Sequence, residues 1–288
     1  MLNAWPAPLT VGTLQLGVGV VYSWLAWTLQ LRRRPDNDTV SEASQKLMHT
    51  IGLCHAMGHL ATTMSLGAGP VSFTHIVKAA EPLFSSAVSA LWLGQYMPWP
   101  VYLTLLPVVG GVGYACLKER LFSWLAFGMA MASNLSFALR AVLSKVALSS
   151  SSKTTLSPVN AYALISRAGF IACLPFVLLG EGTLIWPTLQ SALSQQSAVS
   201  LIQRILLSGL YLHLCNEVMF MALGSVHPIT LAVGNTMKRV FVMWASVLVF
   251  GNVVTVQAAV GSAIGLAGVL AYSLTKQYYE KPQNKKLQ

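Results

Sequence analysis

The chain has 288 residues, of which 55% are hydrophobic and only 9% are charged. Soluble domains carry roughly 25% charged residues, so this composition argues against a soluble fold and indicates many membrane-spanning segments. The net charge of +10 is not laid out as a basic face with interleaved aromatic residues, which argues against nucleic-acid binding.

Nine apolar stretches follow one another along the chain, and the fourth is short for a crossing. They run over residues 9–31, 46–66, 70–93, 100–116, 122–146, 158–180, 201–223, 228–250 and 255–275. Rich in Leu, Val, Ala and Gly without strict alternation, they favour helices over barrel strands. We therefore expect an all-α polytopic membrane protein in contact with a lipid bilayer. No cleavable targeting peptide is visible before the first stretch.

The flanking basic residues predict how the chain is oriented. When the spans are taken alternately, one membrane side receives ten basic residues and the other three. The larger group is Arg32, Arg33, Arg34, Lys46, Lys145, Lys153, Lys276, Lys281, Lys285 and Lys286; the smaller is Lys118, Arg120 and Arg204. Because basic residues concentrate on the cytoplasmic side, the C-terminus is expected on the cytoplasm-like side and the N-terminus opposite.

An internal repeat is the next feature. Pro70 and Pro228, like Tyr114 and Tyr272, are each 158 residues apart within similar stretches, so spans three and four recur as spans eight and nine. Each repeat then holds five spans, and the first lacks its opening helix: 1–120 is the first repeat, 121–276 the second and 277–288 a polar basic tail. An odd number of spans inverts one repeat relative to the other, as in secondary transporters. Chance similarity among apolar, glycine-rich helices is the alternative.

Charged residues inside the spans point to an anion site. Lys238 and Arg239 lie side by side near the centre of span 228–250, where each costs roughly 2.5–3.5 kcal/mol unless it faces water or an anion. The other ionisable residues in the spans are Lys78, Arg140, Arg167, Glu81 and Glu217. Five basic against two acidic residues leave an excess of three positive charges. A carboxylate needs one cation, whereas a phosphate monoester suits several, so we expect phosphorylated small molecules.

Structural roles are the alternatives for some of these residues. Arg140 is about six residues from the end of its span and could extend to the membrane surface. Arg167 could pair with Glu217. At the 158-residue offset Glu81 corresponds to Arg239, which favours an ion pair between those two.

Two histidines on one segment raise the question of a metal. His55 and His59 have the i, i+4 spacing of metal ligands, but no HExxH pattern and no third ligand accompany them, so neither a metal nor a cofactor is predicted. His59 and Thr62 are neighbours on one helical face and could bind a polar ligand. No nucleophile elbow, P-loop or paired-carboxylate constellation appears in the sequence, so we do not expect an enzyme.

Four stretches, Gly58–Ser65, Val71–Lys78, Ala132–Arg140 and Val233–Val240, resemble the plastid phosphate translocator family of the drug/metabolite transporter superfamily. The similarity runs over almost the whole chain from Leu2. It implies ten helices in two inverted five-helix halves, of which the first helix is missing here. It also implies localisation in the plastid (chloroplast) inner envelope.

The resemblance assigns roles to particular residues. Lys78, Lys238 and Arg239 would clamp the phosphate, and Thr62 would add a hydroxyl. His59 and Arg140 would reach the rest of the substrate or complete the cationic pocket.

One stretch departs from the family. The family commonly has His-Leu-Tyr-Asn-Gln where this chain has Cys215 in place of the tyrosine and Glu217 in place of the glutamine. These two residues, with Glu81, are expected around the site rather than in contact with substrate. The two departures change the hydrogen bonding and the charge of the site.

We therefore expect an antiporter that exchanges a hexose, pentose or triose phosphate for inorganic phosphate by alternating access. Residues 72–82, 100–103 and 234–239 are closer to hexose and pentose phosphate carriers, and residues 240–242 and 250–252 to triose phosphate carriers. One alternative is a proton-coupled nucleotide-sugar or metabolite carrier in which Glu81 or Glu217 titrates. Another is a non-transporting membrane protein derived from such a carrier.

Overall fold

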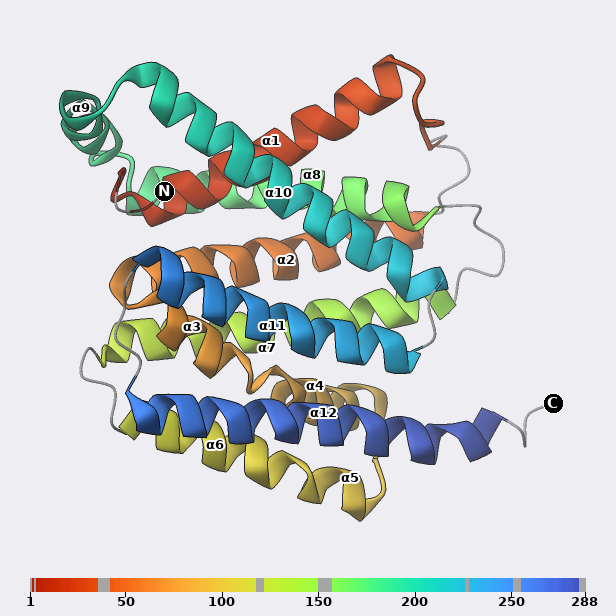
Figure 1. Ribbon diagram of the computed structural model, residues 1–288. Helices are drawn as coiled ribbons and strands as arrows, with labels where there is room; N and C mark the ends of the chain where they lie inside the picture. The colour runs from red at the N-terminus through yellow and green to blue at the C-terminus, as the bar shows by residue number, and fades with distance from the viewer. Residues whose placement is uncertain are drawn as a thin grey trace. The chain divides into compact units, whose positions relative to one another are not determined.

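The computed structural model describes residues 2, 4–35, 42–117, 122–149, 157–225, 228–250 and 255–284, and within them every regular element is a helix (Figure 1). The helices are α1 (Pro8–Thr28), α2 (Glu42–Ala68), α3 (Val71–Lys78), α4 (Glu81–Leu93), α5 (Trp99–Leu103), α6 (Leu105–Leu117), α7 (Trp124–Ser149), α8 (Pro158–Gly180), α9 (Ile185–Gln195), α10 (Ala198–Ser225), α11 (Pro228–Phe250) and α12 (Val256–Asn284). The prediction of an all-α protein is confirmed.

Seven helical stretches among the described residues are long and apolar enough to cross a membrane. They are Pro8–Thr28, Val71–Leu93, Trp99–Cys116, Trp124–Ala147, Pro158–Gly180, Ala198–Ala222 and Val256–Tyr279. The other two predicted spans correspond to α2 and α11, which are equally long. They are more polar, since α2 carries three histidines and α11 carries Lys238 and Arg239. The protein is therefore a polytopic membrane protein.

Prolines explain why two of the spans are interrupted. Pro82 has no N–H to donate, and its ring would clash with the carbonyl of Lys78 four residues earlier. The chain accordingly leaves the helix after Lys78, with the N–H groups of Ala79 and Ala80 bonded to carbonyls only three residues back. Pro107 stands in the same relation to Leu103, where α5 ends. Lys78 is thereby placed at a break in a membrane-spanning segment.

The helices form two compact units, and each unit combines helices from both halves of the sequence. The first unit comprises Met1–Gly67 and Leu139–Gly224, and the second comprises Ala68–Ala138 and Ser225–Gln288. Helix α7 contributes its first part to the second unit and its last part to the first. The two units are defined by which residues contact one another. The predicted repeats, with boundaries at residues 120 and 276, divide the chain by sequence similarity, and they remain a prediction.

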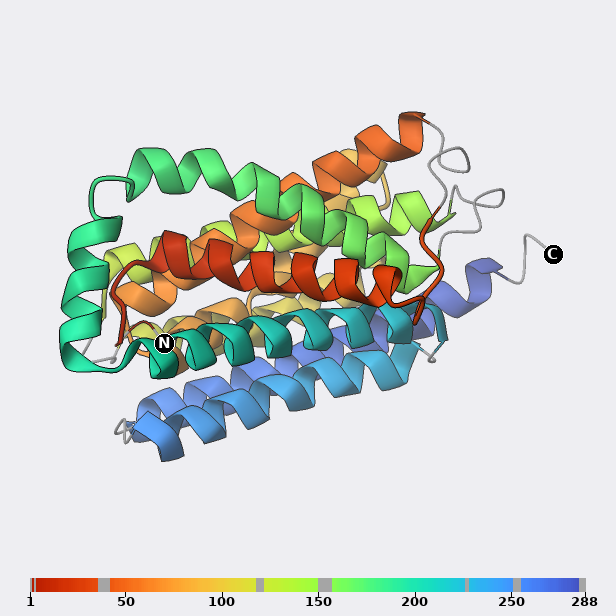
Figure 2. The ribbon, with the colours of Figure 1, turned by 90° about the horizontal axis from the view of Figure 1, so that it is seen from above.

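In the first unit α1 and α8 lie side by side (Figure 2). Leu16, Ala56, Leu60 and Cys173 form one buried cluster beside them. The N-terminus of α1 is capped by a distant carboxylate: Glu181, which is buried, accepts the N–H groups of Leu9 at 2.9 Å and Thr10 at 2.8 Å. These are donors that the first turn of a helix leaves without intrahelical partners.

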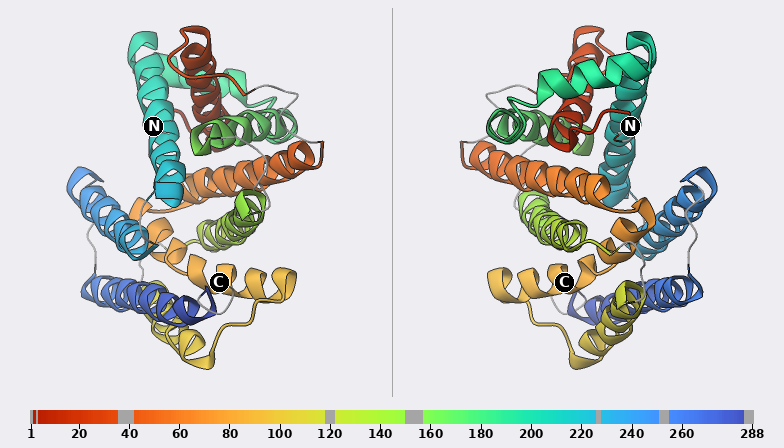
Figure 3. Two further views of the ribbon diagram at one scale, coloured as in Figure 1. Left: turned by 90° about the vertical axis from the view of Figure 1, so that its right-hand side faces the viewer. Right: turned by 90° about the vertical axis from the view of Figure 1, so that its left-hand side faces the viewer.

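In the second unit α6 packs along α12 (Figure 3). Glycines allow the two backbones to approach: a Cβ atom on Gly111 would lie 2.6 Å from the carbonyl oxygen of Gly261 and would also collide with the backbone of Gly265. Small residues at helix contacts are typical of membrane proteins, where close packing drives helix association.

Helix α9 is an element that the sequence analysis did not predict. It has 11 residues, too few to cross a bilayer. Ala192 is buried against the N-terminal segment, where the indole of Trp5 donates a 3.0 Å hydrogen bond to Thr188. Trp186, by contrast, is 65% exposed. The helix thus has one face on the first unit and one face outside it, as short interfacial helices do.

Candidate functional site

Lys78, at the end of α3, is held by two residues of α7. Its ammonium donates a 2.6 Å hydrogen bond to the hydroxyl of Ser133 and lies 4.6 Å from the centre of the Phe137 ring. Asn134 fixes the same turn, because its side-chain amide donates to the carbonyl of Val77 at 3.0 Å. A hydroxyl and a ring are neutral partners, so these contacts orient the ammonium without cancelling its charge.

Lys238 and Arg239 belong to the same unit as Lys78. They lie on α11, which packs against α3. The Lys238 side chain is exposed, and within the described part of the chain no ion pair is recorded for it. The side chain of Arg239 lies outside the described parts of the structure. Its predicted pairing with Glu81, the first residue of α4, therefore falls outside them as well. That ion pair remains a prediction.

Arg140 lies in the first unit and contacts two other helices. Its guanidinium donates to Nδ1 of His55 on α2 at 3.0 Å and approaches the amide oxygen of Asn216 on α10 at 3.5 Å. Its Cζ is 5.9 Å from the centre of the Phe220 ring. Because His55 is buried, the guanidinium points into the unit, and Arg140 does not extend along α7 to the membrane surface.

His59 and Thr62 are engaged with backbone carbonyls. The Nε2–H of the buried His59 donates to the carbonyl of Gly12 at 3.1 Å, which connects α2 to α1. The hydroxyl of Thr62 donates to the carbonyl of Gly58 at 2.7 Å, one turn earlier on α2. Contact of either group with a ligand remains a prediction.

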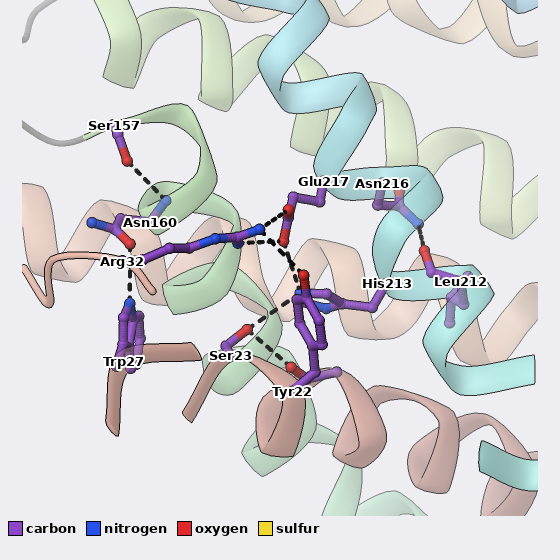
Figure 4. Close-up of polar contacts among 11 residues, drawn as sticks. Tyr22, Ser23, Trp27, Arg32, Ser157, Asn160, Leu212, His213, Asn216 and Glu217 are labelled. Atoms are coloured by element: carbon purple, nitrogen blue, oxygen red, sulfur yellow. Dashed lines mark hydrogen bonds and ion pairs between the residues drawn. The ribbon is translucent and has the colours of Figure 1, made fainter. Parts of the chain in front are cut away.

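Glu217 has a different partner from the one expected. Both of its carboxylate oxygens accept hydrogen bonds from Arg32, at 2.6 and 2.8 Å, and Arg32 also donates to the hydroxyl of Tyr22 at 3.2 Å (Figure 4). On the other side Nε2 of His213 is 3.4 Å from Glu217. The hydrogen bond to Glu217 raises the pKa of Arg32 above its usual value.

The predicted pairing of Arg167 with Glu217 is therefore wrong. Arg32 was assigned only to the membrane flank, but the segment after α1 turns back and brings its guanidinium to the buried carboxylate. Arg167 is exposed and lines a cavity together with Arg34. Cys215, the other departure in this stretch, is also exposed.

The contacts identify residues to which the sequence analysis gave no role at the site. Ser133 and Phe137 hold Lys78, and His55 and Asn216 hold Arg140. Their spacing in the sequence could have indicated Ser133 and Phe137, because residues four apart on α7 lie on one face of the helix. Among the described residues no cluster of three or more His, Cys, Asp or Glu side chains is arranged to hold a metal ion.

Comparison of the sequence with known proteins identifies the family. The sequence model of the Triose-phosphate Transporter family matches residues 1–273. The chain is 40% identical over 286 residues to the chloroplastic triose phosphate/phosphate translocator of Zea mays, covering 99% of this chain and 68% of the relative. It is 35% identical over 278 residues to the chloroplastic glucose-6-phosphate/phosphate translocator 2 of Arabidopsis thaliana, covering 96% and 70%. The protein therefore belongs to the triose-phosphate transporter family.

Proposed function

We propose that the protein exchanges a phosphorylated sugar for inorganic phosphate across a membrane by alternating access. The observation that carries this proposal is Lys78, a cation at the break of a membrane-spanning segment whose ammonium is oriented by a hydroxyl and a ring. Relatives from maize and Arabidopsis are named as triose phosphate/phosphate and glucose-6-phosphate/phosphate translocators. Because both are chloroplastic, we place this protein in the plastid inner envelope.

The phosphate is assigned to Lys78, Lys238 and Arg239. A dianion suits several cations, and interrupted helices in transporters commonly supply the substrate site. The exposure of Lys238 supports this assignment. Thr62 adds a hydroxyl to the phosphate site.

His59 and Arg140 are assigned to the sugar or to the edge of the cationic pocket. Glu81, Cys215 and Glu217 act around the site without contacting substrate. The exposed Cys215, which replaces the family's tyrosine, is the position at which this carrier's substrate preference is expected to differ.

Charge explains why transport should be an exchange. When the pocket closes without an anion, it buries several cations in a low dielectric, which is costly. A bound phosphate or sugar phosphate neutralises them, so only the loaded carrier changes its orientation readily. Net uptake without a counter-substrate is thereby suppressed.

Reconstitution into vesicles tests the proposal. Uptake of labelled phosphate and of triose, pentose and hexose phosphates is compared in vesicles loaded with phosphate and in vesicles without it. We expect uptake only in the loaded vesicles, and loss of it in Lys78→Ala and Lys238→Ala. Lys145→Ala is the matched control, because Lys145 is an exposed lysine of α7 outside the proposed site. Equal uptake in loaded and empty vesicles would refute obligatory exchange.

The proton-coupled alternative has less support. Glu217 was one of its two candidate titrating groups, and both of its oxygens are already bonded to Arg32. Uptake driven by a pH gradient without internal phosphate is the result that would favour this alternative.

A further inference from the structure

The first unit contains a cavity of about 550 Å³ between α1 and α8. Val21 and Trp24 of α1 and Phe170 and Ile171 of α8 form apolar walls, and Arg34 and Arg167 add two cations. None of these residues belongs to the proposed phosphate site, so the cavity needs an explanation of its own.

The walls of the cavity reach the outside of the unit. Val21 is 55% exposed, Trp24 58% and Ile171 54%. Both helices are long and apolar enough to cross a membrane, so exposed apolar side chains on them are suited to lipid chains. A cavity rimmed in this way is open to an amphiphile from the bilayer.

The two arginines lack an acidic partner in the described part of the chain. Both side chains are exposed, and the acid expected to pair with Arg167 is bonded to Arg32 instead. Arg167 lies seven residues into α8 from Asn160, or about 10 Å along the helix. Asn160 itself bonds the indole of Trp27 in α1 and the carbonyl of Arg33 in the segment that follows α1. A cation within a membrane-spanning helix is costly unless it is neutralised.

We propose that this cavity binds an anionic phospholipid, with the headgroup phosphate between Arg34 and Arg167 and one acyl chain along Val21, Trp24 and Ile171. Arg34 belongs to the membrane side that carries most of the basic residues, where anionic headgroups are recognised by basic pockets between helices. A lipid is favoured over a free phosphate because most of the wall is apolar and the two arginines are the only charged residues in the lining.

Lipid titration of the full-length protein tests the proposal. The protein, purified in a neutral detergent, is titrated with phosphatidylglycerol or phosphatidylcholine, and bound lipid is counted by native mass spectrometry. We expect phosphatidylglycerol to bind more tightly. Arg34→Gln and Arg167→Gln should each weaken its binding about five-fold, the equivalent of about 1 kcal/mol per basic residue.

Arg33→Gln is the matched control, because Arg33 is an exposed neighbour that does not line the cavity. Val21→Trp fills the cavity while both arginines remain, and it should also abolish preferential binding even if an arginine variant fails to fold. Equal binding of the two lipids, or an equal loss in Arg33→Gln, would overturn the proposal. So would displacement of phosphatidylglycerol by inorganic phosphate alone, because that result assigns the site to a free anion.

Discussion

Three basic residues in or beside the membrane-spanning helices contact two kinds of group. Lys78 is oriented by a serine hydroxyl and a phenylalanine ring, and Arg140 donates to the unprotonated nitrogen of His55. Arg32, in contrast, is bonded to a carboxylate. A contact with a hydroxyl, a ring or a neutral imidazole positions a cation without offsetting its charge, whereas a contact with a carboxylate offsets that charge. The Arg32 contact is therefore of the kind that stabilises the fold, and the contacts of Lys78 and Arg140 described above are of the kind that orient a side chain.

Removing the hydroxyl that orients Lys78 should weaken phosphate binding. Hydrogen bonds to charged groups contribute about 1.5–3 kcal/mol, so Ser133→Ala should raise the KM for phosphate about ten-fold or more. Exchange kinetics in vesicles measure this. Ser136→Ala is the control, because among the described residues the Ser136 hydroxyl bonds only the carbonyl of Ala132 in its own helix. An unchanged KM in Ser133→Ala would show that Ser133 does not position Lys78.

The Arg32–Glu217 ion pair should matter for stability. Arg32→Ala leaves the buried Glu217 carboxylate without its guanidinium, and breaking such a pair from one side typically costs about 3–5 kcal/mol. Because the Arg32 side chain is 30% exposed, we expect about 2 kcal/mol, nearer the cost of one lost charged hydrogen bond. The readout is a lower thermal unfolding temperature in detergent. Arg33→Ala should leave that temperature unchanged.

The double variant separates the charge effect from the loss of packing. Glu217→Gln removes the charge of the carboxylate and keeps nearly the same side-chain shape, so Arg32→Ala combined with Glu217→Gln should recover part of the stability lost in Arg32→Ala. Strictly additive losses would contradict a direct interaction between the two residues.

For single residues, the sequence predicted which charged side chains are unusual but not which side chains they contact. Lys78 and Arg140 stood out because each carries charge into an apolar span. Their partners come from other helices, and Arg32 and Glu217 are 185 residues apart. Pairing over such separations depends on how helices pack, which residue spacing within one segment does not encode.

Among the helices, the N-terminus of α1 depends on a residue far away in the sequence. Glu181 accepts the N–H of Leu9 and both the N–H and the hydroxyl of Thr10. Glu181→Ala would leave buried donors without a partner, which costs about 1–3 kcal/mol. We expect a lower unfolding temperature and faster hydrogen exchange at Leu9 and Thr10. Glu181→Gln keeps one acceptor oxygen and should lose less; equal exchange in all three proteins would exclude capping by Glu181.

The nine predicted spans all correspond to helices, because a long apolar run is a strong signal. Two features were missed for different physical reasons. The break after Lys78 follows from Pro82, which was present in the sequence, but length alone made residues 70–93 a single span. Helix α9 is too short for a crossing, and its stability depends on contact with Trp5 and Ala7 near the N-terminus.

In the whole molecule, the two compact units do not coincide with the two halves of the sequence. Helices α1 and α2 share a unit with α8, α9 and α10, whereas α3 to α6 share a unit with α11 and α12. Neither half of the sequence therefore contains all the helices of either unit. Apolar patterning predicts each helix but not its partner, so this interleaving could not be read from the sequence.

Interleaving predicts that the two halves of the chain need each other to fold. If the chain is cut between α6 and α7, each fragment expressed alone should be degraded, because its helices lack their partners from the other fragment. Expressed together, the fragments should co-purify through a tag on either one. Stable accumulation of a single fragment would contradict this expectation.

The α6–α12 contact offers the sharpest test of that assembly. Gly111→Val in the first fragment places a branched side chain against the backbone of Gly261 and Gly265, so the amount of second fragment recovered should fall several-fold. Gly113→Val is the matched control two residues away, because a Cβ there meets no described atom within 4 Å. The same amount recovered with both variants would mean that backbone packing at Gly111 does not join the halves. A loss confined to Gly111→Val would show that close glycine packing, rather than apolar composition alone, determines which helices associate.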